Sequence, residues 1–125
     1  MTKDFVIRRW VILEHRVSKN ITQGRHFDLL LEEKNSCRTW RMPKVPCIDG
    51  PSVKVTPIQP HKLYWLERKE AYISGGRGWA KRVEAGFYDD VLLKVDYFQT
   101  SVQIPTKSFK GILEINQDAC RIFSI

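Results

Sequence analysis

The sequence predicts an all-β fold, an antiparallel barrel or sandwich, on the strength of two observations. Short apolar runs, many of them rich in Val, Ile, Phe, Tyr and Trp, recur along the 125 residues and are separated by Gly, Pro, Asn and Asp. No stretch of helical length carries apolar residues at the i, i+3, i+4, i+7 spacing. With no break in composition, the chain is expected to be a single domain over 1–125, with 1–9 as a loosely held lead-in.

The first half of the chain predicts a three-strand meander followed by a fixed loop. Strands are expected at 10–16, 26–33 and 37–42, and Glu33-Lys34-Asn35-Ser36 supplies the turn between the second and the third. Three prolines and a glycine between Pro43 and Pro51 exclude regular structure there, because proline lacks a backbone N–H.

The second half predicts a series of short strands, with a glycine-rich turn at 74–78 and a further turn at Asp89-Asp90. The turn Ser74-Gly75-Gly76-Arg77-Gly78 either closes a hairpin or cradles an anion with its amides. Apolar runs are found at 53–58, 60–66, 71–73, 79–83, 86–88, 91–98, 101–104, 109–116 and 120–123.

Charge and cysteine content point to a polyanionic partner and an intracellular setting. Lys and Arg number 21 against 14 Asp and Glu, giving a net charge of +7 and a pI near 9.5. Such a balance favours nucleic acid through long-range attraction, although a basic surface can also be merely solvated. Cys37, Cys47 and Cys120 lack Cys-x-x-Cys spacing and predict reduced thiols. Without a signal peptide or a long apolar run, we expect a cytoplasmic protein and no membrane partner.

A candidate metal site lies on the strand that begins at His26. Period-two geometry places His26, Asp28 and Leu30 on one face and the apolar residues Phe27, Leu29 and Leu31 on the other. If the run ending at His15 pairs with this strand as a hairpin, His15 faces His26 near the loop. Two histidines and one carboxylate with open positions suit Mn, Fe(II) or Zn in a chemically active site. Alternatively, all three are ordinary surface polar residues.

Several motifs extend this pattern, and in order and spacing over roughly 10–115 they resemble the 3′-phosphoesterase domain of bacterial and archaeal DNA ligase D and its stand-alone relatives. Glu14-His15 followed by His26-Phe27-Asp28 is similar to the family's Glu-His and His-Tyr-Asp-Phe-Arg. Thr39-Trp40-Arg41-Met42-Pro43-Lys44 resembles Ser-Trp-Ala-Val-Pro-Lys, and Pro60-His61-Lys62-Leu63 falls where the family has Asp-His-Pro-Leu. Gly76-Arg77-Gly78 with Glu84-Ala85-Gly86-Phe87-Tyr88 resembles Gly-x-Gly and Asp-x-Gly-x-Trp.

The resemblance implies a compact single-domain antiparallel β-barrel of short strands with long loops. It implies a manganese-dependent phosphoesterase of DNA repair that removes a 3′-phosphate or a 3′-terminal ribonucleoside; Zn²⁺ or another divalent metal could replace Mn²⁺. DNA 3′ ends at a primer–template or at a nicked or broken duplex would be the substrate, and a ligase or polymerase of end joining could be a partner. Carried over by position, His15, His26 and Asp28 match the metal ligands, and His61 matches the histidine that engages the scissile phosphate.

The chain departs from the family where the phosphate is held. Leu30 stands at the position of a family arginine, and Trp65 stands at the position of a family tyrosine. Tyr64 would face the opposite side of a strand and is not counted as a replacement. Gln59 and Pro60 replace acidic residues before His61, and the loop between His15 and His26 is longer than in the family. Basic residues at neighbouring positions could take over phosphate binding: Arg25, Arg41, Lys54 and Arg77.

Two alternatives follow from these departures and from the charge. Leu30 favours a catalytically weakened module of the same fold that binds DNA or RNA ends without cleaving them. A barrel that hydrolyses a small phosphoester or nucleotide is a third hypothesis, which the basic balance disfavours.

Overall fold

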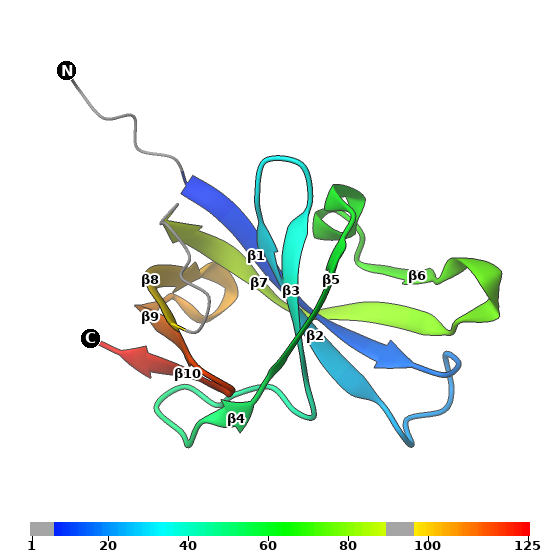
Figure 1. The fold of residues 1–125 in the computed structure, drawn as a ribbon, viewed down its shortest axis with the longest axis horizontal. Coiled ribbons are helices and arrows are strands. Elements are labelled where there is room, and N and C mark those ends of the chain that lie inside the picture. Colours follow the sequence, from blue (N-terminus) through cyan, green and yellow to red (C-terminus); the bar gives the residue numbers. More distant parts are fainter. Residues whose placement is uncertain (1–6, 90–96) are drawn as a thin grey trace.

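The computed structural model of the chain describes residues 7–89 and 97–125, and it is all-β and antiparallel. Ten strands belong to one sheet, in the order β4-β10-β9-β8-β7-β1-β2-β3-β5, with β6 paired to β7 off this path. The long strands β1 and β7 run through the middle of the fold, β8, β9 and β10 lie to one side, and β6 projects on the other (Figure 1). Between the strands, helical segments in the described part are short 3-10 turns.

The elements follow the apolar runs of the sequence. The strands are β1 (Ile7–Arg16), β2 (His26–Glu32), β3 (Cys37–Met42), β4 (Val53–Lys54), β5 (Thr56–His61), β6 (Glu70–Tyr72), β7 (Trp79–Asp89), β8 (Tyr97–Ile104), β9 (Phe109–Asn116) and β10 (Ala119–Ser124). The 3-10 turns are η1 (Leu63–Leu66), η2 (Ser74–Gly76) and η3 (Pro105–Lys107).

The predicted meander is confirmed, because β1, β2 and β3 are consecutive neighbours in the sheet. The turn before β3 closes with the amide of Glu33 donating to the carbonyl of Ser36 at 2.9 Å. Other boundaries differ. The run 60–66 splits into the end of β5 and η1, and 79–83 with 86–88 is one continuous strand, β7. The runs 91–98 and 101–104 meet in β8, although 90–96 lie outside the described residues. Of the predicted lead-in over 1–9, residues 1–6 also lie outside them, whereas residues 7–9 are not loose but belong to β1.

The predicted closure into a barrel is not found. The strand path has two ends, β4 and β5, and these two do not pair with each other. The two end strands are nevertheless successive in the chain, separated only by Val55, whose amide donates to the carbonyl of Asp118 at 2.7 Å. The two edges of the sheet are therefore linked through Val55, and the sheet stays open between them.

The central hairpin is buried on both faces. Trp10, Ile12, Leu29 and Leu31 belong to the main hydrophobic cluster, as period two requires. The residues between them, Val11, Leu13 and Leu30, pack on the opposite face in a second cluster with Cys37, Trp65, Leu66 and Ala80. Below we call this set of buried residues the second cluster.

No helix among the described residues is long and apolar enough to cross a membrane.

The position of Leu30 yields a stability prediction. Leu30 is fully buried in the second cluster, so Leu30→Arg places an unpaired charge in an apolar environment. We expect the free energy of unfolding to fall by about 3 kcal/mol or more, measured by urea denaturation. Leu30→Met, which nearly conserves volume, should cost less than about 1.5 kcal/mol. Equal stability of the two variants would show that this position reaches solvent.

Candidate metal centre

The site begins with the pairing of β1 and β2. These strands are antiparallel, and His15 and His26 are directly opposite each other at the loop end, as the sequence predicts. Asp28 lies two residues further along β2 on the same face as His26, and it is opposite Arg41 of β3. His61 ends β5, the strand that pairs with β3. Four strands thus contribute to one cluster of polar side chains.

The candidate ligand atoms converge. His15 Nδ1 and His26 Nε2 are 2.8 Å apart, and His26 Nε2 lies 3.9 Å from Asp28 Oδ1. One ligand atom from each of the three residues can be chosen so that all lie within 4.8 Å of one another. The other carboxylate oxygen, Asp28 Oδ2, is 3.5 Å from His61 Nε2. The prediction that His15, His26 and Asp28 lie together is therefore confirmed in geometry.

The imidazole of His15 is oriented by the glycine-rich turn. Its Nε2 lies 2.9 Å from the carbonyl oxygen of Arg77, and because a carbonyl only accepts, Nε2 carries the proton. The lone pair of a neutral His15 is therefore on Nδ1, the atom that faces His26. A histidine whose second nitrogen donates to a carbonyl is a common arrangement in metal sites.

Gly78 permits this approach of the turn to β1. It has φ of +113°, and a Cβ at this position would lie 2.2 Å from the carbonyl oxygen of Arg16 and 3.2 Å from His15 Nε2. The turn closes the hairpin between β6 and β7, which is the first of its two predicted roles. It also contributes a carbonyl to the site.

Asp28 is a buried carboxylate surrounded by cationic or potentially cationic groups. It is 3% exposed, and Arg41 Nε donates to its Oδ1 at 3.2 Å. Burial raises the pKa of Asp28, but hydrogen bonds from His61 and Arg41 outweigh this effect and hold the pKa below its ordinary value. The carboxylate is therefore ionised at neutral pH and able to act as a ligand.

His26 is also kept in the form that binds metals. Burial lowers its pKa, and the attraction of Asp28, which acts in the opposite sense, does not compensate. The neutral imidazole consequently persists below the ordinary histidine pKa of about 6.5. The Nδ1 of His61 lies 3.2 Å from the carbonyl oxygen of Gln59, and its Nε2 faces Asp28.

The donor set fits a divalent transition metal. Ligand atoms bound at about 2.0 to 2.2 Å around one ion stand roughly 3 to 3.5 Å apart, and the separations here bracket that range. Before His15 Nδ1 and His26 Nε2 can bind the same ion, the proton between them must leave, because each nitrogen has to offer a lone pair. Two nitrogens and one oxygen suit Mn, Fe or Zn better than Ca or Mg, and they leave positions open for substrate or water.

The cluster opens into a cleft of about 450 Å³. Its lining includes four side chains of the cluster, His15, Asp28, Arg41 and His61. The remaining lining residues are Leu13, Ile58, Gln59, Pro60, Lys62, Tyr64, Trp65, Ile73, Ser74, Arg77 and Ala80.

The four basic residues predicted to bind phosphate or nucleic acid are placed differently. Arg41 and Arg77 line the cleft, although the Arg77 guanidinium bonds to Ser74 through the serine carbonyl and hydroxyl oxygens. Arg25 instead pairs with the buried Glu14 at 2.7 Å and stacks on Phe27, on the opposite face of the hairpin. Lys54 lies on β4 beside Ala119 and does not line the cleft.

Arg41 has the geometry of a phosphate ligand. Only its Nε contacts Asp28, and among the described residues its two terminal nitrogens have no hydrogen-bond partner. Its side chain is 44% exposed beside the candidate ligands. A guanidinium with two free N–H₂ groups can bind two oxygens of one phosphate.

Sequence reasoning missed two kinds of contributor. The carbonyls of Arg77 and Gln59 orient His15 and His61, and a backbone atom has no sequence signal beyond the glycines that let the turn approach. Tyr64 was excluded on the premise of a strand, which is wrong: 63–66 is a 3-10 turn, and both Tyr64 and Trp65 line the cleft. Leu30 and Trp65, which differ from the resembled family, belong to the same second cluster.

Cys37 is not a candidate ligand or nucleophile. It is fully buried opposite His61, and burial raises the pKa of the Cys37 thiol to about 12. Cys120 is equally buried, and its pKa is also raised to about 12. Both thiols therefore stay protonated at neutral pH.

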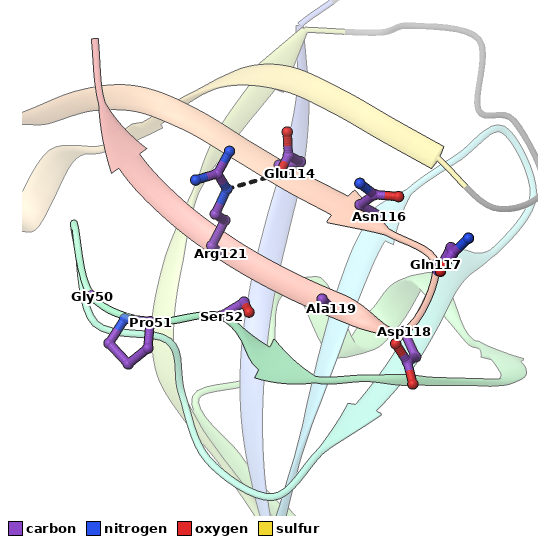
Figure 2. Close-up of a pocket in the computed structure, with 9 residues that line it drawn as sticks. All are labelled: Gly50, Pro51, Ser52, Glu114, Asn116, Gln117, Asp118, Ala119 and Arg121. Carbon is purple, nitrogen blue, oxygen red and sulfur yellow. Dashed lines mark hydrogen bonds and ion pairs between the residues drawn. The ribbon is translucent and has the colours of Figure 1, made fainter.

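A second hollow, of about 530 Å³, lies beside the turn between β9 and β10 and shares no lining residue with the cleft. Figure 2 shows Glu114 and Arg121 paired across the two strands at its wall, with Pro51 and Ser52 on the segment before β4. Its lining contains neither histidine nor cysteine. Its charged lining residues are Glu114, Asp118 and Arg121, whereas His15 and His61 line the cleft.

No protein-family model matches this chain, and no curated protein sequence matches it.

The contact between the turn and His15 predicts the effect of Gly78→Ala. The added Cβ collides with the backbone of Arg16, so the carbonyl of Arg77 must move away from His15. Loss of such an orienting contact typically weakens metal binding 10- to 100-fold. We expect this loss in calorimetric titration with Mn²⁺ or Zn²⁺.

Gly76→Ala is the matched control. Gly76 also has a positive φ, of +69°, but a Cβ there meets nothing within 4 Å. It shares the backbone strain of the first variant without the collision. Equal metal affinity in the two variants would contradict the orienting role of Arg77.

The environment of His26 predicts a dependence of stability on pH. Because the pKa in the folded protein is below the unfolded value of about 6.5, the unfolded chain takes up the proton more readily. This stabilising contribution is present above pH 6.5 and is lost as the pH falls through the lower, folded pKa. In chelator, the urea midpoint of the wild type should drop more between pH 7.5 and 5.5 than that of His26→Gln. An identical drop would show that His26 does not contribute.

Proposed function

We propose that this protein is a metal-dependent phosphoesterase that processes the 3′ ends of DNA strands, removing a 3′-phosphate or a 3′-terminal ribonucleoside. The observation that carries this proposal is the convergence of His15, His26 and Asp28 with His61 and Arg41 in one cluster, of which all but His26 line the cleft. The first three suit a cation, and the last two suit a phosphate. The resemblance of the surrounding motifs supports the same reaction class.

His15, His26 and Asp28 would hold Mn²⁺, or another divalent transition metal such as Zn²⁺. Such an ion polarises a phosphoryl oxygen and lowers the pKa of a bound water. The chain's own contribution is to keep the three ligands ready. The Arg77 carbonyl fixes the tautomer of His15, burial keeps His26 neutral, and Arg41 with His61 keeps Asp28 ionised.

His61 and Arg41 bind the phosphate. His61 Nε2 points toward Asp28 at the cluster, so when protonated it donates to a phosphate oxygen or passes the proton to the leaving oxygen. The two terminal nitrogens of Arg41, which have no hydrogen-bond partner in the described part of the chain, bind oxygens of the same group and offset their charge. Arg41 thus supplies a guanidinium although position 30 is leucine.

The net charge of +7 supports a polyanionic substrate. A positive molecule raises the local concentration of nucleic acid and speeds its encounter with the cleft, most strongly at low salt. A small phosphoester would gain much less from this charge.

A second candidate is a module that binds the same ends without cleaving them. The observation favouring it is that Leu30 is fully buried in the second cluster, so that no arginine projects from this position toward a phosphate. This module would bind metal and DNA ends but would release them unchanged.

A gel assay distinguishes the two candidates. The substrate is a primer–template carrying a 3′-phosphate or one 3′-terminal ribonucleotide, incubated with Mn²⁺, Mg²⁺, Zn²⁺ or chelator. We expect metal-dependent dephosphorylation or shortening that is lost in His26→Ala and Asp28→Ala. Metal binding and salt-sensitive end binding without product would support the module, and an unchanged rate in either variant would overturn the site.

Arg41→Ala tests the phosphate contact. Charge-assisted hydrogen bonds contribute about 1.5 to 3 kcal/mol each, so kcat/KM should fall roughly 10- to 100-fold. Arg38→Ala is the matched control, because Arg38 lies on the same strand but stacks over Trp40 at 5.3 Å, on the opposite face. Comparable losses in both variants would indicate a general effect of charge.

A further inference from the structure

Part of the cleft wall is apolar. Ile58 and Pro60 of β5 and the aromatic residues Tyr64 and Trp65 of η1 line the cleft together with His61. A substrate whose phosphate lies at His61 therefore has its organic part beside these side chains. Such a wall suits a flat, weakly polar group better than a freely hydrated sugar or an inorganic ion.

Tyr64 is held in place while its side chain remains accessible. The residues that follow it in η1, Trp65 and Leu66, are 7% and 3% exposed and belong to the second cluster. Tyr64 itself is 44% exposed. The turn is thus anchored through two buried neighbours, and the tyrosine side chain stays accessible at the cleft.

An arginine and a second aromatic ring complete this arrangement. The guanidinium carbon of Arg68 lies over the Tyr64 ring, 5.5 Å from its centroid. The ring of Trp65 is 4.9 Å from that of Tyr64, tilted by 30°. An aromatic ring combined with an arginine is the usual platform on which proteins stack single-stranded bases, because every base has a π-face.

We propose that Tyr64, supported by Arg68, is the stacking platform for the terminal nucleobase of the nucleic-acid end whose phosphate is bound at His61. This inference rests on the proposed function, and it adds a specificity-determining residue to it. The platform makes the site selective for ends that carry a base over ends that have lost one, with little preference among the four bases.

The first experiment measures stacking without turnover. The probe is an oligonucleotide with a 3′-terminal 2-aminopurine nucleotide and a 3′-phosphate, titrated with protein in chelator. We expect quenching of 2-aminopurine fluorescence, with roughly 5- to 150-fold weaker binding in Tyr64→Ala and near-normal binding in Tyr64→Phe. Tyr72→Ala is the matched control, because Tyr72 is a 70% exposed tyrosine on β6 that does not line the cleft.

The second experiment compares turnover of 3′-phosphate ends with and without a terminal base. The wild type should prefer the base-bearing end, and Tyr64→Ala should lose this preference through KM while its Mn²⁺ affinity stays unchanged. Tyr72→Ala should keep the preference.

The outcomes separate the platform from the proposed function. Quenching lost only in Tyr64→Ala supports the platform even if no variant turns over any end, a result that would overturn the enzyme alone. Turnover that is indifferent to the terminal base, absence of quenching, or equal quenching in wild type and Tyr64→Ala would overturn the platform and leave the enzyme standing.

Discussion

The rest of the site depends on the register of one hairpin. Because His15 pairs directly with His26, the two imidazoles and the Asp28 carboxylate lie on the same face, and the alternate residues are directed into the main core. A slip of one residue would turn Asp28 toward that core and Phe27 toward the cleft, so apolar burial and the metal cluster require the same register. The stability of the fold and the geometry of the site are thus set by the same strand pairing.

Each face of this hairpin buries one carboxylate, and each carboxylate is matched by cations. Glu14, at 3% exposure, is paired with Arg16 and Arg25, and Asp28 is bonded by Arg41 beside His61. The two arrangements differ in where their arginine side chains lie relative to the cleft. The terminal nitrogens of Arg41 have no hydrogen-bond partner among the described residues, and its side chain lies at an open cleft, whereas the cations around Glu14 lie outside that cleft. The Asp28 side therefore offers its hydrogen-bonding capacity at the cleft, and the Glu14 side does not.

Local sequence patterns predicted much of this structure, but they could not predict contacts between segments that are far apart in the chain. Alternation in β2 and the polar loop before it sufficed for the hairpin, the His15–His26 pairing and both faces of the strand. The prediction of a strand at residues 63–66 was wrong, because four apolar residues can form either a strand or a 3-10 turn. Their packing against β1 and β2 determines which of the two forms. Arg25 pairs with Glu14 and Arg41 pairs with Asp28, and these partners depend on which strands are neighbours in the sheet. The carbonyls of Arg77 and Gln59 that orient the histidines are placed by backbone geometry. The expected barrel is not formed, because the two end strands, β4 and β5, do not pair with each other.

The junction at Val55 has a consequence for how the chain assembles. Since β4 and β5 lie at opposite ends of the strand path but are adjacent in sequence, this segment can dock fully only after β10 and β3 are both in position. The β1–β2–β3 meander is local and can form early, whereas β1 must also wait for β7, far along the chain. Such non-local pairing slows folding. Within this segment, β5 pairs with the nearby β3, whereas β4 pairs with the distant β10. Local pairing with the meander can therefore bring His61 beside the two imidazoles of the hairpin, whereas β4 has to wait for β10.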